Sequence, residues 1–490
     1  MSTETVQRPA RVPAAGPPAR DAAPPPRAAL PPPRAILPPP GGMQRSYPAV
    51  AAEPRAHRRW YLTIVVRFWL AVLFATCWVA GSTWISLPWI RGLATHISIV
   101  PAVVVITLVA LIPGHLVAFL AAGVLFDRPR PLADVHPTTP VTVLVAARNE
   151  RPVIAETVRY LAAQDYDGPL HVLLMDNGSD DGTGAAARAE AARTGLDLTV
   201  IVETTPGKSH ALNTGLAHTR TPLVITVDAD TLLQKSAVRL LVARLESSPA
   251  DVVAVAGHLM VRNSRAGFWA RLQVWDYLLG IAAVKRVQGL FQATLVAQGA
   301  FSGYRADALR DAGGWPAAIG EDIVLTWQLL RRGRVYHEPL ALGFTGVPTT
   351  LAQLTRQRSR WARGMLEGLS AVPPWMQRKW TVRGLAMVDL AIPFLDLAYV
   401  FVWLPGLVLA CTGRFWVVGP TTAAVVPMTL LLYLLLFRTQ KRTVFAPLGL
   451  RARRDVVGFV LFVTIYQVFM SAMSLRGYAQ HLLNRRHTWK

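Results

Sequence analysis

The chain has 490 residues, of which 52% are hydrophobic and only 16% are charged. A soluble domain usually carries more charge than this, so the composition favours a membrane protein. The formal net charge of +22 suits anionic lipid or phosphate-bearing ligands. Basic residues collect beside apolar runs and do not form one patch interleaved with aromatics, which argues against nucleic acid as a partner. Cys77 and Cys411 lie in apolar runs and there is no CxxC motif, which argues against a disulfide framework or a zinc site.

Residues 1–60 are predicted to be a disordered cytoplasmic tail. Most of this stretch is Pro, Ala and Arg with very few aromatic residues, and runs such as Pro24-Pro25-Pro26 cannot build a packed core. It lacks the apolar stretch directly after a basic start that marks a signal peptide.

Two transmembrane helices are expected within residues 61–130. The runs Phe68–Ile90 and Ile99–Phe126 are apolar and long enough to cross a bilayer. The short link between them holds one basic residue, Arg91. Both flanks are richer in basic residues, which places them in the cytoplasm by the positive-inside rule. The flanking residues are His57, Arg58, Arg59, Arg128 and Arg130.

Residues 371–490 are predicted to hold an interfacial helix and about three transmembrane helices. The apolar runs are Leu385–Thr412, Phe415–Phe437 and Val456–Leu475. A basic loop between the last two should be cytoplasmic. Five spans from a cytoplasmic start put the C-terminus outside, which conflicts with the basic tail that ends at Lys490. Either the tail breaks the rule, or one run is interfacial or re-entrant.

Residues 137–370 are mixed in character and predict an α/β domain. Short β-rich runs alternate with helical stretches, as in βαβ units with a mostly parallel sheet. The expected strands are Val141–Ala147, Leu170–Met175, Leu198–Val202, Leu223–Val227 and Val252–Ala256.

Acidic residues follow two of these strands. Asp228-Ala229-Asp230 comes directly after Leu223–Val227, at the strand end where α/β folds bind ligands. Such carboxylates suit a hard divalent cation that bridges to a diphosphate, although a solvated turn is the simpler alternative. Asp176 follows Leu170–Met175 and could accept a hydrogen bond from a nucleobase; an Asx turn is the alternative.

Three further motifs open or occupy helices. Lys208, after Pro206-Gly207, is suited to phosphate at a helix start. Glu321-Asp322 offers a general base for a hydroxyl group, or else a helix cap. In Gln357-Arg358-Ser359-Arg360-Trp361, Gln and Arg could hold phosphate and Trp could stack on a sugar. Taken alone, this motif reads as a turn of a basic amphipathic helix.

In this order and spacing, the five motifs resemble family 2 glycosyltransferases that synthesise polysaccharides, namely the cellulose, chitin, hyaluronan and poly-N-acetylglucosamine synthases. The resemblance implies an α/β GT-A-like glycosyltransferase domain at residues 137–370, inserted between transmembrane α-helices. It also implies a multi-pass hexosyltransferase of a bacterial plasma membrane, with the catalytic domain in the cytoplasm.

The resemblance also implies roles for individual residues. Asp322 matches the catalytic base, with Glu321 beside it. Asp228 and Asp230 match the motif for Mg²⁺ or Mn²⁺, with Asp230 as the preferred ligand. Trp361, Gln298 and Gly299 match the acceptor side. The residues implied to bind the nucleotide-sugar are Asn149, Glu150, Asp176, Lys208, Asp228, Asp230, Gln357 and Arg360.

The sequence departs from the family pattern at three positions. Asn177 stands where many relatives have a second Asp, Gly320 replaces the usual Thr, and Arg148 occupies a position where an aromatic residue is common. The first departure weakens the nucleotide assignment at that strand end. The third implies different stacking on the base.

The segment from Glu321 to Trp327 and the segment from Gln357 to Gly364 are most similar to poly-N-acetylglucosamine synthases. This similarity implies inverting transfer from UDP-N-acetylglucosamine to a growing β-linked polysaccharide, coupled to its passage across the membrane. No residue identifies an N-acetyl group, so a cellulose-like synthase using UDP-glucose and a non-processive enzyme with a lipid acceptor stay open. Membrane lipids and a small membrane subunit are the other expected partners. Asp389 and Asp396 lie seven residues apart in one apolar run and could share a face beside a polymer channel, or lie at the interface.

Overall fold

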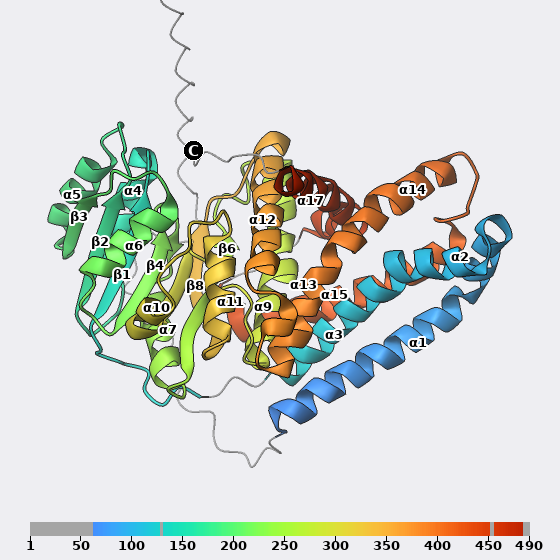
Figure 1. Ribbon diagram of the computed structural model, residues 1–490, viewed down its shortest axis with the longest axis horizontal. Coiled ribbons are helices and arrows are strands. Elements are labelled where there is room, and N and C mark those ends of the chain that lie inside the picture. The colour runs from blue at the N-terminus through green and yellow to red at the C-terminus, as the bar shows by residue number, and fades with distance from the viewer. Residues whose placement is uncertain (1–61, 128–130, 451–454, 484–490) are drawn as a thin grey trace, which may run out of the picture.

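The computed structural model describes residues 62–127, 131–450 and 455–483 (Figure 1). The predicted tail at 1–60 lies outside these residues, as do Arg128 and Arg130 and the last basic residues of the chain. The half that contains the sheet and the half that contains the long apolar helices lie side by side, with the strands at one end of the molecule and these helices at the other (Figure 1).

An eight-stranded mixed sheet forms the centre of the soluble domain, with the order β3-β2-β1-β4-β7-β6-β8-β5. β1 pairs in parallel with β2 and β4, whereas β7 is antiparallel to both β4 and β6. The prediction of an α/β domain is confirmed, and all five expected strands are present. The strands are β1 (Val141–Ala147), β2 (Leu170–Asp176), β3 (Leu198–Val202), β4 (Leu223–Asp228), β5 (Leu232–Leu233), β6 (Val252–Val261), β7 (Phe301–Arg305) and β8 (Arg334–Thr345).

Helices cover this sheet because its central strands are apolar on both faces. β1 is buried along almost its whole length, as expected of a parallel strand between two helical layers. A side chain at Gly215 would place its Cβ 2.7 Å from the Met175 sulfur, so α6 packs closely on β2. The helices of the first half are α4 (Arg151–Ala162), α5 (Thr183–Thr194), α6 (Lys208–His218) and α7 (Ala237–Glu246).

The second half of the domain supplies the remaining helices, of which α8, α9 and α12 contact the long apolar helices. They are α8 (Phe268–Trp275), the π-helix η2 (Asp276–Ala282), α9 (Ala283–Leu290), α10 (Ala306–Asp311), α11 (Glu321–Leu330), α12 (Leu351–Ala371) and the short η3 (Pro374–Met376). Thr350 caps α12, since its hydroxyl accepts from the Gln353 amide at 3.3 Å.

Within the described residues, four helical stretches are long and apolar enough to cross a membrane, two before the domain and two after it. They are Ile64–Ile97, Ile99–Phe126, Trp380–Cys411 and Val456–Leu482. The first stretch is the single helix α1. The second consists of α2 (Ile99–Ile106), η1 (Thr107–Leu111) and α3 (Ile112–Phe126), and the third of α13 (Trp380–Ala398), η4 (Tyr399–Trp403) and α14 (Leu404–Cys411). The fourth consists of α16 (Val456–Leu461), η6 (Phe462–Tyr466) and α17 (Gln467–Leu482).

Three details differ from, or add to, the expected membrane segments. α1 continues through Arg91 to Ile97, so the expected link shrinks to Ser98, which has a positive φ of 68°. The run Phe415–Phe437 falls on α15 (Pro420–Gln440), which is followed by η5 (Lys441–Phe445). Several α15 side chains are not described, and a fifth span stays a prediction.

Asp396 is only 2% exposed and accepts hydrogen bonds from Ser471 at 2.6 Å and Tyr478 at 2.7 Å. It therefore joins α13 to α17, which suits a helix contact better than a channel wall.

Helix α9 attaches the α/β domain to the long apolar helices. The buried Arg286 donates to Asp127, at the end of α3, and to Gln440 Oε1 at 2.9 Å, at the end of α15. A Cβ on Gly123 would lie 2.7 Å from Val287, so α3 and α9 approach closely. Phe291 packs its ring 5.1 Å from that of Phe68 and 5.7 Å from that of Phe119.

Candidate active site

The carboxyl ends of β1, β2 and β4 meet at one edge of the sheet. The strand register pairs Ala147 with Asp176 and Ala146 with Asp228, so both acids lie beside the end of β1. Asn149 and Glu150 follow β1 directly. The structure thus gathers four of the residues that the sequence assigned to a nucleotide-sugar.

Asn149 shapes the loop after β1. Its φ of 56° lies in the left-handed region, which Asn tolerates better than most residues. Its amide donates to Ser179 Oγ at 3.0 Å, and its side-chain oxygen accepts from the Asp180 amide at 3.0 Å. The Glu150 amide donates to Thr183 Oγ1 at 2.8 Å. These bonds hold the β1 loop against the β2 loop.

Asp176 lies where α5 approaches β2 most closely. One carboxylate oxygen accepts from the Ser179 amide at 3.0 Å. A Cβ on Gly184 would lie 2.7 Å from the other oxygen, so only glycine leaves that oxygen its present space. The Asp176 side chain thus holds the loop after β2 through a bond to the amide three residues on, which differs from the Asx turn that the sequence allowed.

Asn177 explains one departure from the family pattern. The residue is buried, and its Nδ2 donates to the carbonyls of Thr205 at 2.7 Å and Glu203 at 3.2 Å. Its Oδ1 accepts from the Gly207 amide at 2.9 Å. A carboxylate could not donate to the two carbonyls, so this chain requires the amide. Asn177 thus holds the loop that positions Lys208.

Lys208 joins two acidic motifs. Its Nζ lies 2.7 Å from Asp228 Oδ1 and 3.6 Å from Glu321 Oε1. Burial alone would lower the pKa of Lys208, but the Asp228 and Glu321 carboxylates outweigh burial and raise the pKa above its usual value. A Cβ on Gly299 would lie 2.9 Å from Nζ, so the end of the lysine side chain lies directly against this glycine. The lysine is therefore a fixed positive charge between the strand end and α11.

Asp230 lies two residues after Asp228, just beyond the end of β4. Burial, followed by the charge of Asp228, raises the pKa of Asp230 to about 6, while Arg262 and Lys208 oppose the rise. Two carboxylates one residue apart fit a hard divalent cation. Across residues 62–127, 131–450 and 455–483 there is no group of three or more His, Cys, Asp or Glu side chains that could hold a metal. A cation at this site would thus need ligand or water oxygens to complete its shell.

Glu321 and Asp322 begin α11 in different surroundings. Glu321 is turned toward Lys208, and burial raises its pKa to about 7 even though the lysine opposes this. Asp322 Oδ2 accepts from the Gly299 amide at 3.3 Å. Thr326 Oγ1 donates to the Asp322 carbonyl at 2.6 Å and accepts from the Ala297 amide at 2.9 Å. The loop containing Gly299 is therefore attached to the first turn of α11.

Gly320 explains another departure. A Cβ there would lie 2.7 Å from the Cα of Gly364 on α12, and a Cβ on Gly364 would lie 2.8 Å from the Cα of Gly320. The amides of Ile319 and Gly320 donate to Glu367 Oε2 at 2.7 and 3.3 Å. The usual threonine would not fit, because α12 touches the backbone just before the acidic pair.

The motif from Gln357 to Trp361 lies on α12, one turn before this glycine contact. Trp361 is 36% exposed and Arg360 is also exposed, so both side chains can reach a ligand. Gln298 has another partner: its Nε2 donates to the Gly257 carbonyl at 2.7 Å and holds the loop to β6. That anchoring role was not predicted from the sequence.

Lys285 is a residue of the site region that the sequence did not single out. It is buried, and its Nζ donates to the Val296 carbonyl at 2.8 Å, in the loop that leads to Gly299. Burial lowers the pKa of Lys285 to about 7, and the charge of Asp322 opposes this. An isolated lysine in a helical stretch gives no signal of such a contact.

Comparison with known families decides what this arrangement is. Residues 137–364 match the family described as glycosyltransferase like family 2. They form a family 2 glycosyltransferase domain. The family resemblance of the motifs is thereby confirmed.

Two polysaccharide synthases are similar in sequence to this glycosyltransferase domain. One is the poly-beta-1,6-N-acetyl-D-glucosamine synthase of Staphylococcus aureus strain COL, 31% identical over 237 residues, which are 48% of this chain and 57% of the relative. The other is the synthase of the same description from Staphylococcus epidermidis, 30% identical over 226 residues, with shares of 46% and 54%. The chain spans little more than half the length of these relatives.

A solved structure supports the fold. A mannosyltransferase from Pyrobaculum calidifontis, in complex with GDP-mannose and Mn²⁺, superposes with a TM-score of 0.54 at 22% identity. The match covers 78% of this chain and 99% of that structure. The predicted GT-A-like fold is confirmed.

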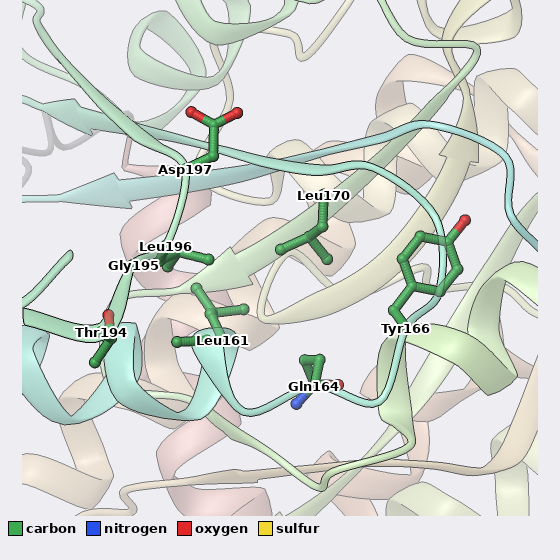
Figure 2. A pocket seen from close by; sticks show the side chains of 9 residues that line it. Leu161, Gln164, Tyr166, Leu170, Thr194, Gly195, Leu196 and Asp197 are labelled. Atoms are coloured by element: carbon green, nitrogen blue, oxygen red, sulfur yellow. The ribbon is translucent and has the colours of Figure 1, made fainter. Parts of the chain in front are cut away.

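The glycosyltransferase domain also has a cavity of about 260 Å³ away from the acidic residues of the candidate site (Figure 2). It is lined by Leu161, Gln164, Tyr166, Leu170 and Asp197, among others. Leu170 begins β2 and Asp197 precedes β3, so the cavity opens at the edge of the sheet opposite Asp176. It is therefore no part of the site.

Proposed function

We propose that this chain transfers N-acetylglucosamine from its UDP-sugar to a growing β-linked polysaccharide at the cytoplasmic face of a bacterial plasma membrane. The observation that carries the proposal is the position of Lys208, 2.7 Å from Asp228 and 3.6 Å from Glu321. Lys208 thereby joins the proposed diphosphate site to Glu321, the residue directly before the proposed base Asp322. The choice of sugar and polymer is supported by the names of the staphylococcal relatives.

In this proposal, the donor is held at the strand ends. Asp176, with the loop of Asn149 and Glu150, meets the uridine. Lys208 offers its charge to the diphosphate, and Gln357 and Arg360 approach the same phosphates from α12. Asp230 and Asp228 would hold the cation. When bound there, Mg²⁺ or Mn²⁺ supplies positive charge to the departing diphosphate.

Asp322 is the proposed base. It takes the proton from the acceptor hydroxyl while that oxygen bonds to the anomeric carbon and the bond from that carbon to the diphosphate oxygen breaks. A single displacement of this kind inverts the anomeric centre. The Gly299 amide, 3.3 Å from Asp322 Oδ2, orients the carboxylate toward the acceptor loop. Trp361 provides the apolar face on which the acceptor sugar stacks.

The membrane half is proposed to serve export. The four apolar stretches, with α15 as a fifth, would carry the polymer out while the catalytic domain stays in the cytoplasm. Passage across the membrane and a small partner subunit are parts of this proposal.

A panel of donors tests the proposal. Purified full-length protein would receive UDP-N-acetylglucosamine, UDP-glucose or GDP-mannose with Mn²⁺, and both UDP release and product length would be measured. We expect long chains of N-acetylglucosamine from the first donor only. The Asp322→Asn variant is the matched control, because it keeps the nucleotide site. Polymer from UDP-glucose would indicate a cellulose-like enzyme, and a single sugar on lipid would indicate the non-processive alternative; either result overturns the proposal.

A further inference from the structure

Helix α12, which carries the Gln357–Trp361 motif, is fixed against the last membrane helix. α12 and α17 run side by side (Figure 1). Ser359 Oγ donates to the Met473 carbonyl at 2.9 Å. A Cβ on Gly477 would lie 2.3 Å from the Ser359 carbonyl, so the two helices touch through their backbones. The motif is therefore held from the membrane side at its middle residues.

Arg358, directly before this contact, is buried in an ion pair. It is 5% exposed, and its Nη2 lies 2.5 Å from Asp276 Oδ2. The Tyr466 hydroxyl donates to the same oxygen at 3.3 Å. A Cβ on Gly280 would lie 2.7 Å from the other Asp276 oxygen, so the acid is closely packed on that side too. The guanidinium thus has a fixed partner.

Both partners lie in π-helical segments. Asp276 begins η2 and Tyr466 ends η6. Single π-helical turns are uncommon and occur often at functional sites, because they redirect one side chain out of the α-helical register. Here one π-helix supplies the acid that pairs with Arg358, and the other supplies the hydroxyl group that donates to that acid.

The same guanidinium covers the ring of Trp361. Its central carbon lies 4.2 Å from the ring centroid. The two residues are three apart on α12 and share a face. A cation over an aromatic face is attracted by the ring, more strongly where water is excluded. Because Trp361 keeps 36% of its surface exposed, the ring is fixed on one side and still open to a ligand.

We propose that Arg358 is a positioning residue: it fixes the Trp361 ring in the orientation in which an acceptor sugar stacks, and Asp276 and Tyr466 hold the arginine. This inference rests on the proposed function, in which Trp361 is the acceptor platform. The ion pair between Arg358 and Asp276 alone would only join α12 to η2. Because Arg358 also contacts the Trp361 ring, transfer to the acceptor would depend on the arginine as well.

Sugar transfer and donor hydrolysis, measured separately, test the inference. The variants are Arg358→Met, which loses charge and planarity, Arg358→Lys, which keeps only the charge, and Tyr466→Phe, which loses one hydroxyl group. In Arg358→Met we expect transfer to fall roughly ten-fold, as for a lost buried cation–π contact, with UDP binding and hydrolysis nearly unchanged. Arg358→Lys should recover part of the loss, and Tyr466→Phe should show a smaller one. Arg356→Met is the control, since this exposed arginine is on the same helix.

A double variant separates positioning from mere stability. If Arg358 acts through the ring, Arg358→Met combined with Trp361→Ala should lose no more transfer than Trp361→Ala alone. Additive losses, or equal losses of UDP binding, hydrolysis and transfer, would overturn the inference while leaving the proposed function intact. No transfer to any acceptor by the unaltered protein would instead contradict the proposed function, and the inference with it.

Discussion

Asn177 permits a sharp test, because restoring the family's usual aspartate should damage this chain. In Asn177→Asp the Nδ2 donor disappears, and the carbonyls of Thr205 and Glu203 lose their bonds of 2.7 and 3.2 Å. Asn177 is buried, whereas Thr205 is exposed and Glu203 is partly exposed, so water can replace part of the lost bonding at the two carbonyls. The main cost is one buried carboxyl group that faces acceptors and has no donor to offer them, roughly 1–3 kcal/mol. For a domain of this size, that lowers the unfolding midpoint by at least about 2 °C.

The assay is thermal unfolding of the purified full-length protein at several pH values. Burial should raise the pKa of the new carboxyl above its unfolded value of about 3.9. The penalty should accordingly be smallest below pH 4 and grow as the pH rises through the folded pKa, since a protonated acid can still donate one bond. Asp180→Asn is the matched control, because it makes the reverse exchange at an exposed position of the same loop. A midpoint shift under 1 °C at pH 8, or a penalty independent of pH, would refute the reasoning.

Three further predictions concern the site. Asp322→Asn should reduce transfer by roughly 10²–10⁴-fold with UDP binding retained, as for a lost general base; near-normal turnover would remove Asp322 from that role. Chelation should abolish transfer, and because the pKa of Asp230 is raised to about 6, activity should fall as the pH drops through that value. Added Mn²⁺ should shift this fall in activity to lower pH, because the cation competes with the proton for the carboxylate. A fall in activity at the same pH with and without added Mn²⁺ would contradict the prediction. Gly320→Thr should lower both the unfolding midpoint and the transfer rate, because the threonine Cβ would lie 2.7 Å from the Cα of Gly364. A variant as stable and as active as the original protein would show that α12 can move away from position 320 without loss of stability, and would contradict the prediction.

The sequence predicted the parallel part of the sheet well because those strands are continuous apolar runs. Three strands were missed. β5 has only two residues, and β7 and β8, at Phe301–Arg305 and Arg334–Thr345, contain Gly, Arg or Pro and carry no clear alternation. β7 enters the sheet antiparallel between β4 and β6, an order that only long-range packing decides. The sequence also did not show that α1 continues past Arg91 to Ile97, because a basic residue between two apolar runs indicates a link between two helices.

In the candidate site, motif order located the residues but not their partners. The distance between Lys208 and Glu321 depends on how α6 and α11 meet, and these helices are more than 100 residues apart in the sequence. Asn177 and Gly320 looked like departures because their reasons lie in other segments, the Glu203–Gly207 loop and Gly364. Lys285 gave no signal, since a single basic residue on a helix is ordinarily a solvated one. Arg358 was part of a motif, but the sequence did not show that it would be buried against Asp276 and not exposed like Arg360.

The attachment through α9 affects how the protein can be studied. The boundaries 137 and 370 suggest a domain that could be expressed alone, yet Arg286 takes its partners Asp127 and Gln440 from outside them. Phe291 likewise packs on Phe68 and Phe119. An excised domain would expose this apolar surface together with an unpaired arginine, and such surfaces promote association. The catalytic unit that folds and dissolves well is thus the one that keeps its membrane helices, in detergent or lipid.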